Sequence, residues 1–141
     1  MSRNKVIALP ERTLVFIKPD GVRRKLIGKI IKRFEQKGFE IKAICQMTVT
    51  PELAKKHYAE HLAKPFYPEL EAFLTSGPIV AMVLEGRDAV SAVRNLVGAT
   101  DAAKAVPGSI RGIYSLSKSE NVIHASDSLQ SAKREIQNFF G

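Results

Sequence analysis

The segment Ile79-Val80-Ala81-Met82-Val83-Leu84 is apolar at every position and follows Ser76-Gly77-Pro78, which breaks the chain. A short apolar run bounded by turn residues is typical of a strand that is buried on both faces. Such a strand needs other strands beside it and helices or a second sheet over its faces. We therefore expect this segment to be a central strand of a covered sheet.

Three further segments have strand character. Thr13 to Ile17 is a short apolar run that ends at Lys18-Pro19-Asp20-Gly21, where proline and glycine favour a turn. Phe39 to Val49 is predicted as a second strand, and the last strand is expected around Val122 and Ile123.

Helices are predicted between the strands. Ile27, Ile30, Ile31 and Phe34 recur at helical spacing, and Gly38 ends that helix. Thr50-Pro51-Glu52 is a good helix opening because threonine caps a helix and proline fits its first turn. The remaining helical stretches are expected from there to His61, over Pro68 to Thr75, over Asp88 to Val97, and at the C-terminus with Leu129, Ala132, Ile136 and Phe139 or Phe140 inward.

This order predicts an α/β fold of the α+β type, a ferredoxin-like βαββαβ sandwich whose four-stranded antiparallel sheet is covered by helices. At 141 residues the chain fits one core, so we expect a lead-in over residues 1–11 and a single domain over 12–141. No apolar run approaches the roughly 18 residues of a membrane span. The single cysteine, Cys45, suits a reducing cytosol, so a cytoplasmic location is expected.

A histidine stands at the junction between the last strand and the last helix, in Asn121-Val122-Ile123-His124-Ala125-Ser126-Asp127-Ser128. Unpaired N–H groups at a helix start favour an anion, and imidazole is nucleophilic near neutral pH. The segment alone is compatible with a nucleophile beside an anion site or with an ordinary surface histidine.

Other polar residues stand where a fold does not require polarity. Lys18 ends the first strand, and Arg94 lies on a predicted helix. Thr100 lies in a long Gly-, Ala- and Pro-rich stretch, and Arg111 follows that stretch. With Asn121 they supply cations, a hydroxyl and an amide, a set that suits an oligophosphate. The net charge of +8 agrees with a small polyanion such as a nucleotide, or with nucleic acid.

The chain closely resembles the nucleoside diphosphate kinase family, of the bacterial type. The matching blocks run from Glu11-Arg12-Thr13 through Ile17 to Val22, Ser76-Gly77-Pro78, Val97 to Thr100 and Pro107 to Gly112 to the Asn-x-x-His-[Gly/Ala]-Ser-Asp pattern at Asn121. The resemblance implies a kinase that transfers the γ-phosphate of a nucleoside triphosphate, typically ATP, to a nucleoside diphosphate. The reaction would be ping-pong, with His124 as nucleophile and a pros-phosphohistidine intermediate.

The resemblance also assigns roles to the other residues. Lys18 and Tyr58 would stabilise the moving phosphoryl group, while Arg94, Thr100 and Arg111 would hold the remaining phosphates. Asn121 and Lys18 would reach the ribose, and Phe66 with Leu70 would form a slot for any base. Glu135 would accept a hydrogen bond from the other imidazole nitrogen of His124. Ser126 would support Glu135 or the helix cap. Mg²⁺ is expected to arrive on the nucleotide phosphates, with no protein side chain assigned to it.

Some positions depart from the family pattern. Ala125 replaces a more usual glycine, Asp101-Ala102 follows Thr100 in place of Asn-Pro, and Ile113 stands where an acid is common. The resemblance implies a homo-oligomer, either a tetramer or a hexamer. The last two changes touch a loop that often contributes to subunit contacts, so they bear on which of the two forms.

Two other classes of protein are weighed against the kinase. A ferredoxin-like RNA-binding module would use the charge of +8, but the strands lack the paired exposed aromatic residues of an RNA-recognition motif. A catalytically silent scaffold would be expected to have lost His124 or Lys18, and both are present. Nucleic acid therefore remains a secondary partner.

Overall fold

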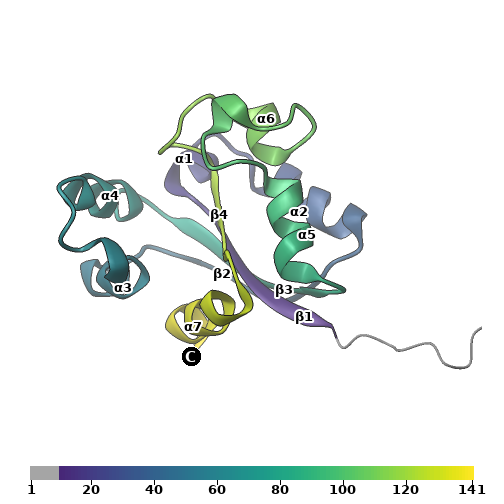
Figure 1. Cartoon of the computed structure of the whole chain (residues 1–141), viewed down its shortest axis with the longest axis horizontal. Helices are drawn as coiled ribbons and strands as arrows, with labels where there is room; N and C mark the ends of the chain where they lie inside the picture. Colours follow the sequence, from purple (N-terminus) through teal and green to yellow (C-terminus); the bar gives the residue numbers. More distant parts are fainter. Residues whose placement is uncertain (1–9) are drawn as a thin grey trace, which may run out of the picture.

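A four-stranded sheet in the order β2-β3-β1-β4, with every neighbouring pair antiparallel, forms the centre of the molecule. The structure is a computed structural model that describes residues 10–141 (Figure 1). Residues 1–9 of the expected lead-in lie outside the described residues, and Glu11 already belongs to β1. The strands are β1 (Glu11–Ile17), β2 (Glu40–Met47), β3 (Ile79–Gly86) and β4 (Ile123–Ala125).

Helices cover both faces of the sheet, as Figure 1 shows. Helices α2 and α5 pack on one face, and α3, α4 and α7 pack on the other. The α-helices are α1 (Pro19–Arg23), α2 (Ile27–Lys37), α3 (Pro51–His57), α4 (Tyr67–Leu74), α5 (Ala89–Val97), α6 (Ile110–Tyr114) and α7 (Leu129–Phe140), with short 3₁₀ turns η1 (Ala59–His61) and η2 (Ala102–Lys104). The predicted ferredoxin-like architecture is confirmed. No described helix has the length and apolar character needed to cross a membrane.

Strand β1 supplies both halves of the core. Val15 and Ile17 face the cluster under α2 and α5, while Leu14 and Phe16 face the cluster under α3, α4 and α7. All four side chains are fully buried. The strand is apolar throughout because successive side chains point to opposite, covered faces.

The structure differs from the sequence prediction at several element ends. The segment after Lys18 is the first turn of α1, because Pro19 fits the start of a helix. The helix that opens after Thr50 stops at His57 and continues only as the turn η1. Helix α6 was not predicted, and Leu129 is 51% exposed because it is the first residue of α7 and precedes the buried face of that helix.

Candidate active site

His124 lies on β4, in register with Phe16 of β1. Its ring stacks on that of Phe16, with the ring centroids 4.8 Å apart and the planes 25° from parallel. Because Phe16 is fully buried, the stack fixes the imidazole on a rigid part of the sheet.

The hydrogen bond to Glu135 orients the imidazole further. Nε2 of His124 lies 2.7 Å from Oε1 of Glu135, and the hydroxyl of Ser126 donates to the same oxygen at 2.7 Å. A carboxylate oxygen accepts, so Nε2 carries the proton and Nδ1 keeps its lone pair. Burial raises the pKa of Glu135, and the hydrogen bond from Ser126 acts in the opposite direction. The predicted pairing of Glu135 with His124 is present, and Ser126 supports Glu135 while Ser128 caps α7.

Burial also keeps His124 neutral. It lowers the pKa of His124 well below the usual value, and the positive charges of Lys18, Arg111 and Arg94 lower it further. A neutral imidazole is the nucleophilic form.

The cations around His124 are held by backbone carbonyls and by Asn121. Arg111 donates to Gly98 O at 2.9 Å and to Ile123 O at 2.6 Å, and Arg94 donates to Ala125 O at 3.0 Å. The two arginines therefore bind the two ends of β4. Burial, followed by the charge of Arg94, lowers the pKa of Arg111 to about 10, so the guanidinium is charged at neutral pH.

Asn121 connects Lys18 to the loop that carries Thr100. Its Oδ1 accepts from Lys18 Nζ at 2.8 Å, and its Nδ2 donates to Thr100 O at 2.8 Å and to Lys118 O at 2.9 Å. Burial, followed by the charge of Arg111, lowers the pKa of Lys18 to about 8.

A cavity of about 820 Å³ gathers the predicted residues. Every predicted site residue except Ser126 lines it: Lys18, Tyr58, Phe66, Leu70, Arg94, Thr100, Arg111, Asn121, His124 and Glu135. Ser126 is fully buried behind Glu135. Their spacing along the chain does not by itself show that these residues meet. The fold brings them together in one cavity.

Another part of the cavity lining is apolar and partly exposed to solvent. Phe66 stands at the start of α4 with 47% of its surface exposed, and Leu70 lies one turn further along the helix. Tyr58 lines the same cavity, and its ring contacts those of His57 and His61. Burial, followed by the charge of Glu135, raises the pKa of Tyr58 to about 12, so its phenol stays protonated and can donate.

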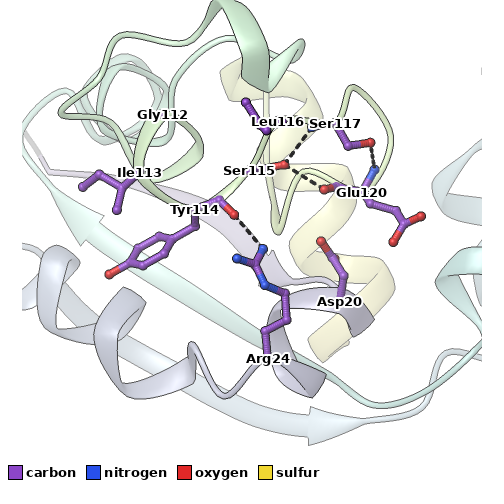
Figure 2. A pocket seen from close by; sticks show the side chains of 9 residues that line it. All are labelled: Asp20, Arg24, Gly112, Ile113, Tyr114, Ser115, Leu116, Ser117 and Glu120. Atoms are coloured by element: carbon purple, nitrogen blue, oxygen red, sulfur yellow. Dashed lines mark hydrogen bonds between the residues drawn. The ribbon is translucent and has the colours of Figure 1, made fainter.

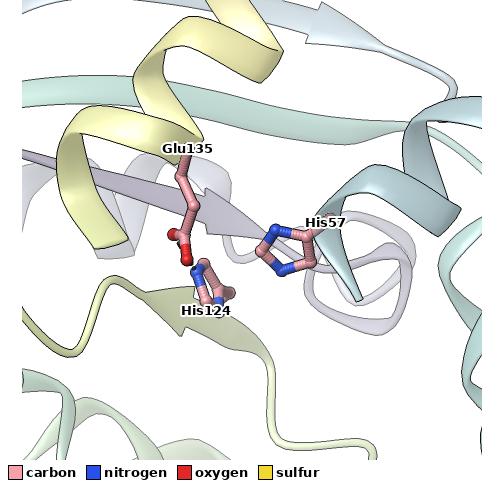
Figure 3. Close-up of side chains that lie close together, drawn as sticks. All are labelled: His57, His124 and Glu135. Carbon is pink, nitrogen blue, oxygen red and sulfur yellow. Dashed lines mark hydrogen bonds and ion pairs between the residues drawn. The ribbon is translucent and has the colours of Figure 1, made fainter. Parts of the chain in front are cut away.

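His57 is part of this site and was missed from the sequence. Its ring lies edge-on to that of His124, with centroids 4.5 Å apart and planes at 87° (Figure 3). The ring of His57 also contacts that of Phe16. Burial lowers the pKa of His57 to about 3. The available signal was its place directly before Tyr58 at the end of a helix.

Comparison with known proteins identifies the family. A family model described as nucleoside diphosphate kinase matches residues 11–141. The nucleoside diphosphate kinase of Staphylothermus marinus is 60% identical over 130 residues, which cover 92% of each chain. That of Rubrobacter xylanophilus is 59% identical over 131 residues, covering 93% of this chain and 98% of the relative.

The chain belongs to the nucleoside diphosphate kinase family.

Solved structures agree with this assignment. The Aquifex aeolicus nucleoside diphosphate kinase superimposes with a TM-score of 0.90 at 47% identity, covering 94% of this chain and 96% of the other. A halophilic nucleoside diphosphate kinase from Halobacterium salinarum, solved in complex with CDP, gives 0.90 at 52% identity over 92% and 87% of the two chains. The predicted family and enzyme class are confirmed, and nothing favours the RNA-binding module.

Asp20 binds the backbone of Val122, two residues before His124. Its buried Oδ2 accepts from Val122 N at 3.1 Å, where Val122 has a positive φ of 78°. A second cavity of about 560 Å³ lies beside it, and hydrogen bonds among Ser115, Ser117 and Glu120 order the loop that leads to Asn121 (Figure 2). The sequence signal for Asp20 was an acid in the turn that ends a buried strand.

The departures from the family pattern are accommodated locally. Ala125 has no positive φ, so its place in β4 does not require glycine. Asp101 accepts from Ala103 N at 3.2 Å and so caps η2. Ile113 on α6 is 50% exposed.

Proposed function

We propose that this chain transfers the γ-phosphate of a nucleoside triphosphate, typically ATP, to a nucleoside diphosphate through a phosphohistidine at Nδ1 of His124. In the first half-reaction Nδ1 attacks the γ-phosphorus, the N–P bond forms, and the bond to the β-phosphate oxygen breaks to release the diphosphate. In the second, a terminal phosphate oxygen of the acceptor diphosphate attacks the same phosphorus, a new O–P bond forms, and the N–P bond breaks to restore neutral His124. One observation carries this proposal: the carboxylate of Glu135 accepts a hydrogen bond from Nε2 of His124. This bond leaves the lone pair on Nδ1 of His124 available at a cavity lined by cations.

The cations would provide most of the catalytic assistance. Phosphoryl transfer needs positioning and stabilisation of charge on the phosphoryl oxygens more than it needs covalent help from the protein. Lys18 and the protonated phenol of Tyr58 stabilise the phosphoryl group while it is being transferred. Arg94, Thr100 and Arg111 bind the phosphates that do not move, and they do so in both half-reactions.

Recognition of the nucleoside would be shared between two parts of the cavity lining. Asn121 and Lys18 bind the ribose hydroxyls. Phe66 stacks on the base and Leu70 packs beside it. An aromatic face does not distinguish one base from another, so this arrangement supports broad use of nucleotides.

Mg²⁺ fits the phosphate end of this site as an ion bound mainly to the substrate. The carboxylate of Asp127 is exposed and lines the cavity, so it would hold the ion through one of its waters. The ion supplies neutralisation of phosphate charge. The residues of the chain then have to orient the phosphates and keep Nδ1 aimed at phosphorus.

We further propose that the chain acts in the cytoplasm and assembles as a homo-oligomer, a tetramer or a hexamer. Exposed apolar side chains on the edge strand β2 and around α6 support assembly: Ile44, Val106, Ile113 and Leu116 are 51%, 72%, 50% and 86% exposed. Light scattering coupled to gel filtration measures the mass directly, and a monomer at micromolar concentration would contradict the assembly.

The test of the reaction is incubation with γ-labelled ATP and Mg²⁺ in the absence of an acceptor. We expect an acid-labile, alkali-stable label on the protein that any added nucleoside diphosphate removes. His124→Ala should remain unlabelled. An unlabelled wild-type protein, or full labelling of His124→Ala, would overturn the mechanism.

A further inference from the structure

Three side chains at the centre of the molecule form a cluster with the composition of a transition-metal site. His57 comes from the end of α3, His124 from β4 and Glu135 from α7, and Figure 3 shows the three side chains converging. One potential ligand atom from each residue lies within 4.8 Å of the others. Two imidazoles and one carboxylate are a ligand set that zinc commonly uses when a fourth position stays open.

We propose that His57, His124 and Glu135 bind a Zn²⁺-class divalent cation, and that this binding blocks the nucleophile. The site is separate from the expected Mg²⁺ position, because Mg²⁺ prefers oxygen ligands and nucleotide phosphates while imidazole suits Zn²⁺, Co²⁺ and Cu²⁺. The binding step stands on geometry alone. The inhibitory consequence rests on the proposed function of His124.

The geometry requires only small movements. A tetrahedral zinc ion with bonds of about 2.0–2.1 Å places its ligand atoms roughly 3.4 Å apart. His124 Nε2 and Glu135 Oε1, now 2.7 Å apart, would open slightly, and the His57 ring would move toward them. The cavity that His124 and Glu135 line provides space for water as the fourth ligand.

His57 has a nitrogen available for such a bond. Its side chain is buried, with 7% exposure, and Nδ1 has no hydrogen-bond partner among residues 10–141. A buried polar atom without a partner is unusual and calls for a physical explanation. Among the described residues, the ring of His57 packs against those of Phe16, Tyr58, His124 and Phe139. A metal ion would satisfy one of its nitrogens.

Nearby cations limit the affinity of this site. Lys18, Arg94 and Arg111 all act on the charge of His124, and they repel a divalent ion as they repel a proton. Glu135 offsets one charge, and the neutral imidazoles need to release no proton before they bind the ion. Bound nucleotide phosphates would neutralise the same cations, so zinc should bind the nucleotide complex at least as well as the free protein.

Metal binding would change the tautomer of His124. The ion takes the lone pair at Nε2, and the proton that Nε2 now donates to Glu135 moves to Nδ1. A protonated Nδ1 has no lone pair with which to attack phosphorus. Zinc would therefore stop phosphorylation without competing for the nucleotide.

The binding test uses cobalt as a spectroscopic probe on the full chain without nucleotide. We expect one equivalent of Co²⁺ to produce visible d–d bands of a four- or five-coordinate ion, and Zn²⁺ to displace it. His57→Phe keeps the ring and its packing but removes the ligand nitrogens, so affinity should fall at least about tenfold. His61→Ala is the control because His61 is the remaining histidine of the chain and lies outside the cluster.

A second variant keeps the test decisive if His57→Phe does not fold. Glu135→Gln preserves the size of the side chain and removes the carboxylate, so it should also lose the cobalt bands. Wild-type cobalt spectra and affinity in a folded His57→Phe or Glu135→Gln would overturn the proposed site. Absence of cobalt binding by the wild-type protein would overturn it as well, whatever the kinase assay shows.

The functional test follows the label on His124 in excess Mg²⁺-ATP at buffered free Zn²⁺. Zinc should suppress labelling of the wild-type protein and of His61→Ala, while the labelling of His57→Phe should resist at least about tenfold more zinc. Equal zinc sensitivity of His57→Phe would overturn the inhibitory mechanism. A wild-type protein that binds cobalt but never labels would instead contradict the kinase mechanism, so the two failures are distinguishable.

Discussion

Lys18 Nζ donates a hydrogen bond to Asn121 Oδ1 across 2.8 Å, although 103 residues separate the two in the chain. Lys18 follows the end of β1, and Asn121 precedes β4, which pairs with β1. The bond therefore follows from the pairing of these two strands. It places a desolvated ammonium beside His124.

The charge of Lys18 should limit activity in alkaline solution. Burial and Arg111 lower its pKa to about 8, so the ammonium is present below that pH and is lost above it. We expect kcat/KM to fall as pH rises through about 8, since this ratio reports the free enzyme. Lys18→Arg stays charged over this range, so its profile should be flat between about pH 7 and 9 even if its activity is lower. A wild-type profile that is flat to about pH 9.5 would contradict this role of Lys18.

Glu135→Ala should slow phosphorylation more than it weakens nucleotide binding. Without its acceptor at Nε2, His124 can place its proton on Nδ1, and the ring loses one of its orienting bonds. We expect the rate of labelling in rapid-quench experiments to fall roughly ten- to a hundredfold, with nucleotide affinity nearly unchanged.

Ser126→Ala tests the hydrogen bond that supports Glu135, which in turn orients His124. It removes only the hydroxyl that donates to Glu135, so the labelling rate should fall in the same direction by a smaller factor. A matching loss of nucleotide affinity in Glu135→Ala would assign Glu135 to folding of the site, not to orientation of His124.

Phe66→Ala should weaken every nucleotide by a similar amount. Stacking of a base on an aromatic ring contributes about 1–3 kcal/mol, so KM for adenine, guanine and cytosine nucleoside diphosphates should each rise by a factor of roughly 5 to 160. Phe66→Trp keeps a stacking face and should stay near wild type. Loss confined to one base would show that recognition reads the base edge and not its face.

Local sequence signals predicted the secondary structure where each element's own residues decide it. The apolar runs of β1 and β3 and the helical spacing of Ile27, Ile30 and Phe34 placed these elements correctly. Gly38 ends α2 with a φ of 108°, as its position suggested. Helix α6 was not predicted because its five residues are too few to show a helical repeat of apolar residues.

The sequence and the family resemblance predicted which residues form the site and one of their contacts, the pairing of Glu135 with His124, but not the rest of its geometry. The motif around His124 and the family resemblance named the residues that line the cavity. Which atoms meet depends on strand pairing and on α7 folding back over β1, and no local pattern encodes these contacts. His57 and Asp20 were missed for this reason: their roles come from tertiary contacts with His124 and Val122.

Gly21 should be essential for the approach of α1 to the chain before β4. A Cβ at this position would lie 2.7 Å from Ile17 Cγ2 and 3.0 Å from Val122 O, and the second contact is with backbone, which cannot rotate away. We expect Gly21→Ala to lower the free energy of unfolding by about 1–3 kcal/mol and to reduce labelling, because Val122 leads directly to His124. Gly28→Ala is the matched control: Gly28 lies in α2, where a Cβ would meet no atom within 4 Å, so alanine should stabilise the protein by roughly 0.5–1 kcal/mol. Urea unfolding of the two variants measures both changes, and equal stability of Gly21→Ala and wild type would show that this contact relaxes without cost.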